Sequence, residues 1–156
     1  MQLTTAMLAD GAQLAQGKLY VLGGQWDRLM VGALPAQHPT MAVVLAIRVE
    51  YNEAPKAYKL AVELKLDGKP MGAKATAQMS VGHAPGLAYG APQFAPAALT
   101  FTNVQFDKFG RYEWVVSADD EPLGSIPLEV LAIPGTAASA SPAGGGESAE
   151  DHGDED

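Results

Sequence analysis

The side chains that could hold a metal ion are few in this chain. Its three histidines, His38, His83 and His152, fall in expected loops or in the C-terminal tail, and none forms a His-x-x-x-His or His-Glu pair. Zinc ligands commonly occur at such short spacings. The chain has no cysteine, which excludes disulfides and thiolate ligands. We therefore expect no metal site and no cofactor.

Patterns typical of catalysis are equally scarce. Asp119, Asp120 and Glu121 are adjacent, so we expect solvated residues of a turn rather than two carboxylates converging on a cleft. The segment Gly86–Gly90 lacks the lysine and the helix start of a phosphate-binding loop. No Gly-x-Ser-x-Gly elbow occurs. These observations predict that the protein is not an enzyme.

The first candidate contact site is Trp26-Asp27-Arg28. An exposed tryptophan beside an ion pair is suited to contact a small molecule or a carbohydrate. The alternative is structural: Trp26 caps the core, while Asp27 and Arg28 satisfy backbone groups of a turn.

The second candidate is the connection 82–96, which is longer than the usual four to six residues and contains three prolines. It carries Leu87, Tyr89 and Phe94. These side chains form either a stiffened apolar contact surface or a plug that closes the open end of the core.

The elements that must position these candidates are β-strands. In Tyr58–Leu66 every even position is apolar, while the odd positions are Lys, Ala, Glu and Lys. Asp67-Gly68 follows, a pair typical of a two-residue hairpin turn. Similar alternation marks Thr40–Val49, Ala75–Val81, Arg111–Ser117 and Ile126–Val130, and further strand candidates are Leu3–Leu8, Lys18–Leu22 and Trp26–Met30.

Two of these strands contain predicted irregularities. Pro127 interrupts the last alternating segment and predicts an edge strand, because proline cannot donate to a ladder. The apolar phase changes within Ala97–Phe106, which predicts a bulge near Asn103.

Eight or nine short strands, with turns every 8–12 residues and no amphipathic helix, predict an all-β fold. We expect an immunoglobulin-like β-sandwich of mostly antiparallel strands, with a jelly roll as the alternative. The segment Phe109–Pro122 resembles the closing hairpin of such sandwiches, with Tyr112 near the corner where its strand begins.

Composition divides the chain into a domain, 1–133, and a tail, 134–156. The tail contains Gly, Ala, Ser, Pro and acids but no aromatic residue, so we expect it to be disordered. Six of the 18 acidic residues lie there, which leaves 12 acids and 10 bases in the domain. With no clustered basic face, we expect no nucleic-acid partner. No apolar run reaches about 18 residues, so we expect no membrane span. The beginning of the chain lacks a signal peptide's basic region, which predicts a cytoplasmic protein.

The block Ala9–Leu29 is the most distinctive stretch, because strand-like segments lead into a predicted turn at Gly23-Gly24-Gln25-Trp26. We expect the two glycines to allow positive φ or a close backbone approach where the chain leaves one sheet. The block resembles the signature of a family of small bacterial proteins known only as a domain of unknown function. The resemblance covers most of residues 3–131. It implies a fold, but no reaction and no site residues.

Two functional hypotheses follow. The first is a non-enzymatic interaction module that binds a protein partner or associates with itself. The second is a small-molecule or carbohydrate site, or a hydrolase, around the Trp26 loop. Clustering of Trp26, Asp27 and Tyr89 around one pocket would favour the second hypothesis.

Overall fold

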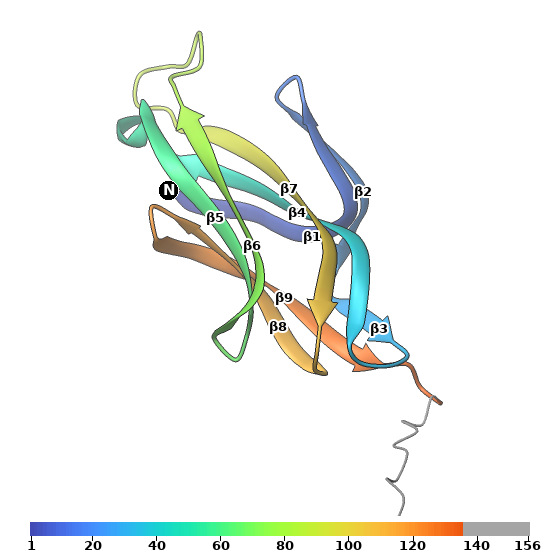
Figure 1. Cartoon of the computed structure of the whole chain (residues 1–156). Coiled ribbons are helices and arrows are strands. Elements are labelled where there is room, and N and C mark those ends of the chain that lie inside the picture. The colour runs from blue at the N-terminus through green and yellow to red at the C-terminus, as the bar shows by residue number, and fades with distance from the viewer. Residues whose placement is uncertain (136–156) are drawn as a thin grey trace, which may run out of the picture.

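The computed structural model describes residues 1–135, which form nine β-strands and one short 3-10 helix, η1 (Tyr51–Glu53) (Figure 1). No helix long and apolar enough to cross a membrane occurs among them. All but the first two residues of the predicted disordered tail lie outside the described residues. The strands are β1 (Gln2–Ala15), β2 (Lys18–Trp26), β3 (Arg28–Val31), β4 (Ala36–Val49), β5 (Lys56–Leu66), β6 (Lys69–Val81), β7 (Gln93–Phe106), β8 (Gly110–Ala118) and β9 (Glu121–Ala132).

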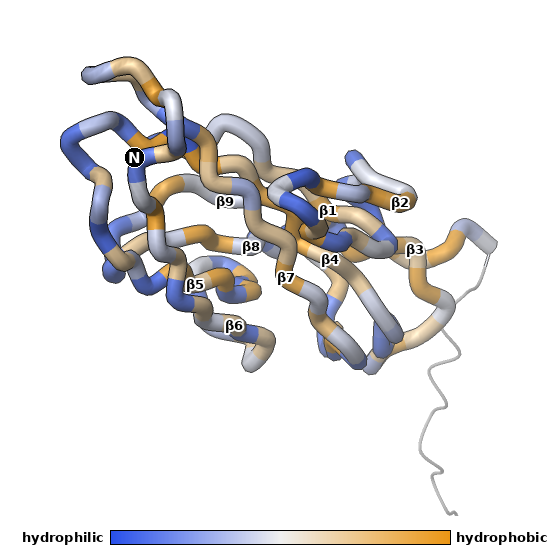
Figure 2. The backbone as a smooth tube through the Cα atoms, turned by 90° about the horizontal axis from the view of Figure 1, so that it is seen from above, coloured by the Kyte–Doolittle hydropathy of each residue, from blue (hydrophilic) through white to orange (hydrophobic). Residues whose placement is uncertain are grey.

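The strands form two sheets. Sheet A has the order β2-β1-β4-β7, and sheet B has the order β3-β9-β8-β5-β6. Among the strand pairs of residues 1–135, only the pairing of β3 with β9 is parallel. From above, β5, β6, β8 and β9 lie on one side of the molecule and β1, β4 and β7 on the other (Figure 2). The prediction of an all-β sandwich of eight or nine mostly antiparallel strands is therefore confirmed.

The core lies between the sheets, and the alternating segments supply it as the sequence predicts. Side chains two residues apart project to the same face of a strand, so most segments bury every second residue. In β4, Ala42 and Val44 are buried as well, in a small second cluster with Ala9 of β1. Trp114 is the largest fully buried side chain. The buried residues of the alternating segments that belong to the main core are Met41, Val43, Leu45, Ile47, Val49, Leu60, Val62, Leu64, Val81, Tyr112, Trp114, Val116, Ile126, Leu128 and Val130.

Tyr112 marks the corner where β8 begins, as the sequence predicts. Its hydroxyl donates a hydrogen bond of 2.8 Å to the backbone carbonyl of Lys108. Burial raises the pKa of Tyr112 above its ordinary value, so the phenol remains a donor at neutral pH. This bond fixes the chain between β7 and β8.

The expected Gly23-Gly24-Gln25-Trp26 turn is wrong, because β2 continues through these residues and the turn lies earlier, at Gln16-Gly17. Leu8 pairs with Trp26 but Ala9 pairs with Gly24, which leaves Gln25 as the extra residue of a β-bulge. The predicted positive φ is confirmed for Gly23, which has φ +57° and where an added Cβ would collide with the Asp10 carboxylate. Gly24 has no positive φ, but an added Cβ there would lie 3.0 Å from Val21 Cγ1.

Three further expectations need correction. β9 is not an edge strand, because β3 pairs with it from Glu129 onward, two residues beyond Pro127. Asn103 does adopt a positive φ of 53°, but the register of β7 with β4 does not shift there, so the irregularity is no bulge. His38 lies in β4 rather than in a loop.

Candidate functional site

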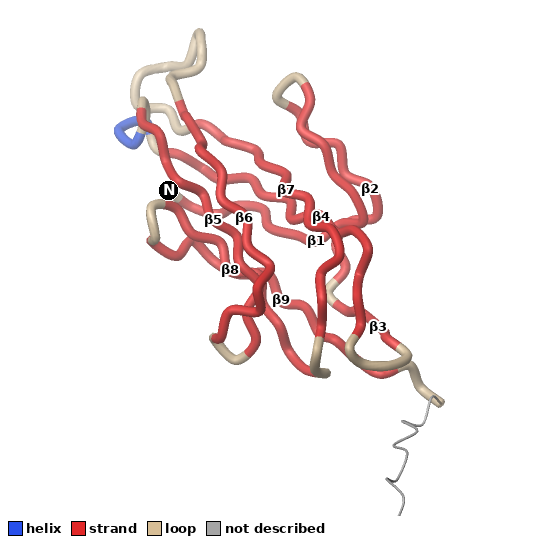
Figure 3. Tube along the Cα trace, viewed as in Figure 1, coloured by secondary structure: helices blue, strands red, loops and turns tan. Residues whose placement is uncertain are grey.

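The connections β4–β5 and β6–β7 lie at the same end of the sandwich (Figure 3). The first contains η1 with Tyr51, and the second is the predicted long connection, which spans 82–92 rather than 82–96. Residues 93–96 already pair with β4, from Val49 to Ala46. The connection is thus shorter than predicted, because β7 begins at Gln93 and includes Pro96.

Three rings from these two connections contact one another. The Tyr51 and His83 rings stack with centroids 4.2 Å apart and an angle of 23° between their planes. The Tyr89 ring lies 4.8 Å from the Tyr51 ring at 57°. Together with Phe94, two residues past the connection, we call these residues the aromatic end: Tyr51, His83, Tyr89 and Phe94.

The connection 82–92 is built from two successive β-turns. Leu87 N–H donates to the Ala84 carbonyl and Ala91 N–H to the Ala88 carbonyl, both at 3.0 Å. The third residue of each turn is a glycine with φ near +80°, which a side chain would oppose. Tyr89 occupies the second position of its turn, so its ring is held at the tip of a defined backbone.

Gln93 ties this connection to the sheet. Its side-chain amide donates to the Gly82 carbonyl at 2.6 Å and accepts from the Ala84 N–H at 3.2 Å. The two bonds close the base of the connection where β7 begins. Folding therefore already restricts the conformations of Tyr89. Less conformational entropy remains to be lost when a partner binds.

Exposure decides between the two interpretations of the connection. Tyr89 is 91% exposed and Phe94 is 63% exposed, while Leu87 is half-buried. Tyr89 and Phe94 therefore do not plug the sandwich. The inner positions of β7 are taken by Ala95 and Ala97, which pack against the core, so Phe94 faces away from it.

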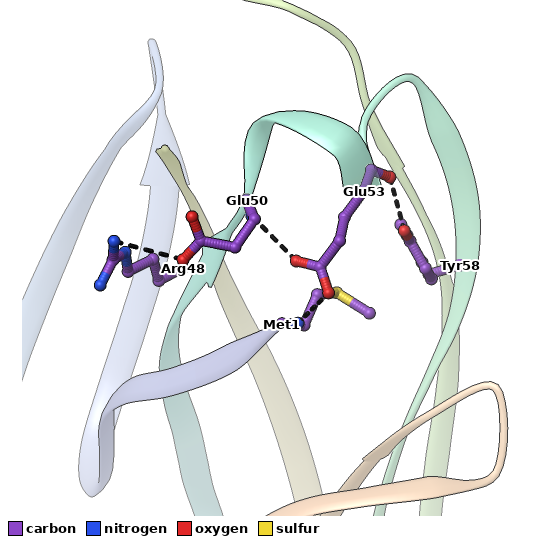
Figure 4. A network of polar contacts seen from close by, with 5 residues as sticks. All are labelled: Met1, Arg48, Glu50, Glu53 and Tyr58. Carbon is purple, nitrogen blue, oxygen red and sulfur yellow. Dashed lines mark hydrogen bonds and ion pairs between the residues drawn. The ribbon is translucent and has the colours of Figure 1, made fainter. Parts of the chain in front are cut away.

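A polar network holds η1, and with it Tyr51, against the sheet (Figure 4). The Glu53 carboxylate contacts the amino group of Met1 and accepts the Glu50 N–H at 2.8 Å. The Tyr58 hydroxyl donates to the Glu53 carbonyl. The bond from the Met1 amino group, followed by that from Glu50, lowers the pKa of Glu53. Glu53 is thus ionised at neutral pH and fixes the turn.

The Trp26 region lies elsewhere. Trp26 is half-buried and packs against the core, as its structural interpretation predicts, and its ring is 5.8 Å from that of His38. Asp27 and Arg28 are exposed and form an ion pair at 3.9 Å. Between β2 and β3, the Asp27 backbone carbonyl accepts a hydrogen bond from the Glu129 N–H of β9.

A cavity of ≈ 220 Å³ is lined by Trp26, Asp27 and neighbouring residues of β1, β2 and β9. Tyr89 is not among the lining residues. Within residues 1–135, no group of three or more His, Asp or Glu side chains is placed to hold a metal ion.

Tyr51 is a member of the aromatic end that the sequence does not predict. It lies two residues past the end of β4, and its partners His83 and Tyr89 belong to a connection far along the chain. The available signal is a tyrosine in the non-alternating segment Glu50-Tyr51-Asn52-Glu53, which does not reveal a partner.

The strand order and the buried inner faces define a β-sandwich protein. Within that class, the chain belongs to the Family of unknown function (DUF6941), whose model matches residues 4–131. The resemblance that the sequence predicts is thereby confirmed. Comparison with the curated proteins and with the solved structures finds no match to this chain.

Proposed function

We propose that this protein is a non-enzymatic interaction module that binds a protein partner through the aromatic end. The observation that carries the proposal is Tyr89, an almost fully exposed ring at the tip of a connection held by its own hydrogen bonds. Aromatic side chains are enriched among the residues that dominate protein interfaces. A ring that is already ordered loses less entropy when a partner binds.

The position of the aromatic end supports the same proposal. We also propose that the sandwich is immunoglobulin-like, because β1-β4-β7 and β5-β8-β9 match the order of its two sheets and Tyr112 makes its corner bond. In an immunoglobulin-like sandwich, the β4–β5 connection that carries Tyr51 corresponds to the connection between the second and third strands. Variable domains of antibodies bind with loops at that end, so this support is a fold-level analogy.

The small-molecule alternative has less support. It requires Trp26, Asp27 and Tyr89 around one pocket, and only the first two share one. Their cavity is smaller than the roughly 300–1,000 Å³ typical of ligand pockets, and the Trp26 ring is used to cover the core.

The test is photo-crosslinking from position 89. A benzophenone amino acid replaces Tyr89 in the full chain, and a matched control carries it at Gln78, which is exposed on β6. We expect one discrete cross-linked protein from position 89 in cells and none from position 78. Equal, diffuse cross-linking from both positions would contradict the proposal, as would turnover of a substrate by the pure protein in a broad hydrolase screen.

A further inference from the structure

We propose that two copies of this chain associate by antiparallel pairing of β2 with β2 of the second copy, about a two-fold axis at Tyr20. This surface is distinct from the aromatic end. The β1–β2 hairpin stands apart from the rest of the sandwich in Figure 1, with β2 on its free side. The proposal therefore does not depend on the proposed function.

The other sheet edges carry features that oppose strand addition. β6 contains Pro70 with Lys69 and Lys74, β7 contains Pro96, and β3 has four residues. Proline, lysine and short length are the usual means of blocking an edge. The segment Leu19–Leu22 of β2 has neither proline nor charge. The part of β7 past Pro96 shares this property, but its exposed residues are polar: Thr100, Thr102, Asn103 and Gln105. β2 is thus the edge that combines an unblocked backbone with large exposed apolar side chains, Tyr20 and Leu22.

The side chains along β2 favour an apolar strand as the occupant. Leu22 is 74% exposed and Tyr20 is 54% exposed, and they project to the same face. They border a shallow groove of ≈ 320 Å³ whose other lining residues include Gly11 and Gln13 of β1. An added strand would satisfy the free backbone groups of β2 and cover both side chains.

The sequence of β2 is complementary to itself. The regular part of the strand is Lys18–Leu22, because Gly23 turns to positive φ. An antiparallel pair centred on Tyr20 places Tyr20 opposite Tyr20 of the second copy, and Lys18 opposite Leu22. Aromatic rings that face each other across strands stabilise a pair. No like charges meet in this register.

Charge does not oppose a second copy at this place. Six of the eight net negative charges lie in residues 134–156, and residues 1–133 carry a net charge of −2. The hairpin segment 9–26 contains one acid, Asp10, and one base, Lys18, and is neutral. The two Lys18 residues lie about 13 Å apart along the paired strands, beyond the screening length at physiological salt.

The experiment is sedimentation equilibrium of the full chain between about 5 and 500 µM, because pairing through one short strand forms a small and weak interface. We expect the mass to rise from monomer to dimer over this range. Leu22→Lys places lysine opposite Lys18 twice per dimer and should weaken association about tenfold. Leu22→Glu places a carboxylate opposite Lys18 of the other copy, twice per dimer, and should preserve the association.

The matched control is Met30→Lys, which adds the same charge at an exposed residue of the edge strand β3 and should leave association unchanged. A monomer at all concentrations would overturn the proposal. A dimer that weakens equally with Lys and Glu at position 22, or that persists with Lys, would also overturn it.

A covalent test fixes the register without relying on affinity. The chain has no cysteine, so Tyr20→Cys introduces a single thiol that faces its copy at the two-fold axis. Mild oxidation should yield a disulfide-linked dimer much faster than for Gln78→Cys, an exposed control position on β6. Equal rates for the two variants would contradict the pairing.

Discussion

Within residues 1–135, the aromatic rings of the core and those of the aromatic end have similar spacing and opposite surroundings. In the core, Phe101 lies 4.3 Å from Trp114, and Phe106 meets Tyr112 edge-on at 5.1 Å. At the aromatic end, Tyr51 lies 4.2 Å from His83 and 4.8 Å from Tyr89. The core rings come from β7 and β8, whereas the surface rings, apart from Phe94, come from connections.

The difference is burial, and it separates stability from contact. Trp114 is fully buried, and its removal leaves a cavity that the two sheets cannot fill. The exposed rings of the aromatic end remove little apolar surface from water, so they contribute little to folding. Their apolar faces remain available to a partner. Contacts between aromatic rings therefore stabilise the fold where the rings are buried and leave a surface for a partner where they are exposed.

The largest expected effect is that of Trp114→Ala. We expect a loss of about 3–5 kcal/mol of unfolding free energy, because the variant deletes the largest buried side chain of the core. Urea denaturation followed by circular dichroism measures this loss, or shows that the variant is unfolded. A loss below 1 kcal/mol would contradict the central role of Trp114 in packing.

A smaller effect is expected for Tyr112→Phe, which keeps the ring against Phe106 and removes only the hydroxyl. The Lys108 carbonyl loses its 2.8 Å bond, so we expect destabilisation of about 1 kcal/mol. Thermal unfolding is the measurement. An unchanged melting temperature would show that the corner bond does not stabilise the fold.

Glu53→Gln sharpens the comparison because Glu53 holds the turn that carries Tyr51. We expect a loss of about 0.5–1 kcal/mol at pH 7, since the contact is partly exposed. The pKa of Glu53 is lowered in the folded state, first by the Met1 amino group. Its stabilisation is therefore present above the unfolded-state pKa and is lost as pH falls through the folded-state pKa.

The measurement for Glu53 is the stability of both proteins from pH 7 to pH 3. The two curves should converge as the pH falls through the lowered folded-state pKa of Glu53, where the wild-type carboxyl becomes protonated. A difference that stays constant over this range would show that the ionised carboxylate is not the source of the stabilisation.

The core group follows from the sequence, whereas the surface group does not. Strict alternation in Arg111–Ser117 places Tyr112 and Trp114 on one buried face, because a strand has a period of two. Tyr51 and Tyr89 lie outside alternating segments, and their contact depends on how two distant connections meet. The length of the connection 82–96 indicates Tyr89 and Phe94 as candidates, but length and composition do not distinguish a core plug from a contact surface.

The same limit explains the errors at the edges. Pro127 has no backbone N–H to donate to a neighbouring strand, which favours an edge position. β3 nevertheless pairs with β9 from Glu129, two residues later, and the residue type at position 127 does not reveal this strand. Gly23 indicates a positive φ correctly, but a turn and a bulge require the same backbone freedom, so the residue type does not distinguish them.

The smallest expected effect on stability is that of the double variant Tyr89→Ser/Phe94→Ser. Both residues are exposed, so we expect a change within about 0.5 kcal/mol. Thermal unfolding beside the wild type measures it. A large loss would show that these rings support the fold and are not a free surface.

The most direct test of contact through the aromatic end compares partner retention and stability in three proteins. The partner identified by cross-linking from position 89 is passed over immobilised wild type, Tyr89→Ser/Phe94→Ser and Tyr112→Phe. We predict that the double variant keeps its melting temperature and loses the partner, whereas Tyr112→Phe melts earlier and retains it. Retention of the partner by a folded double variant would contradict the account.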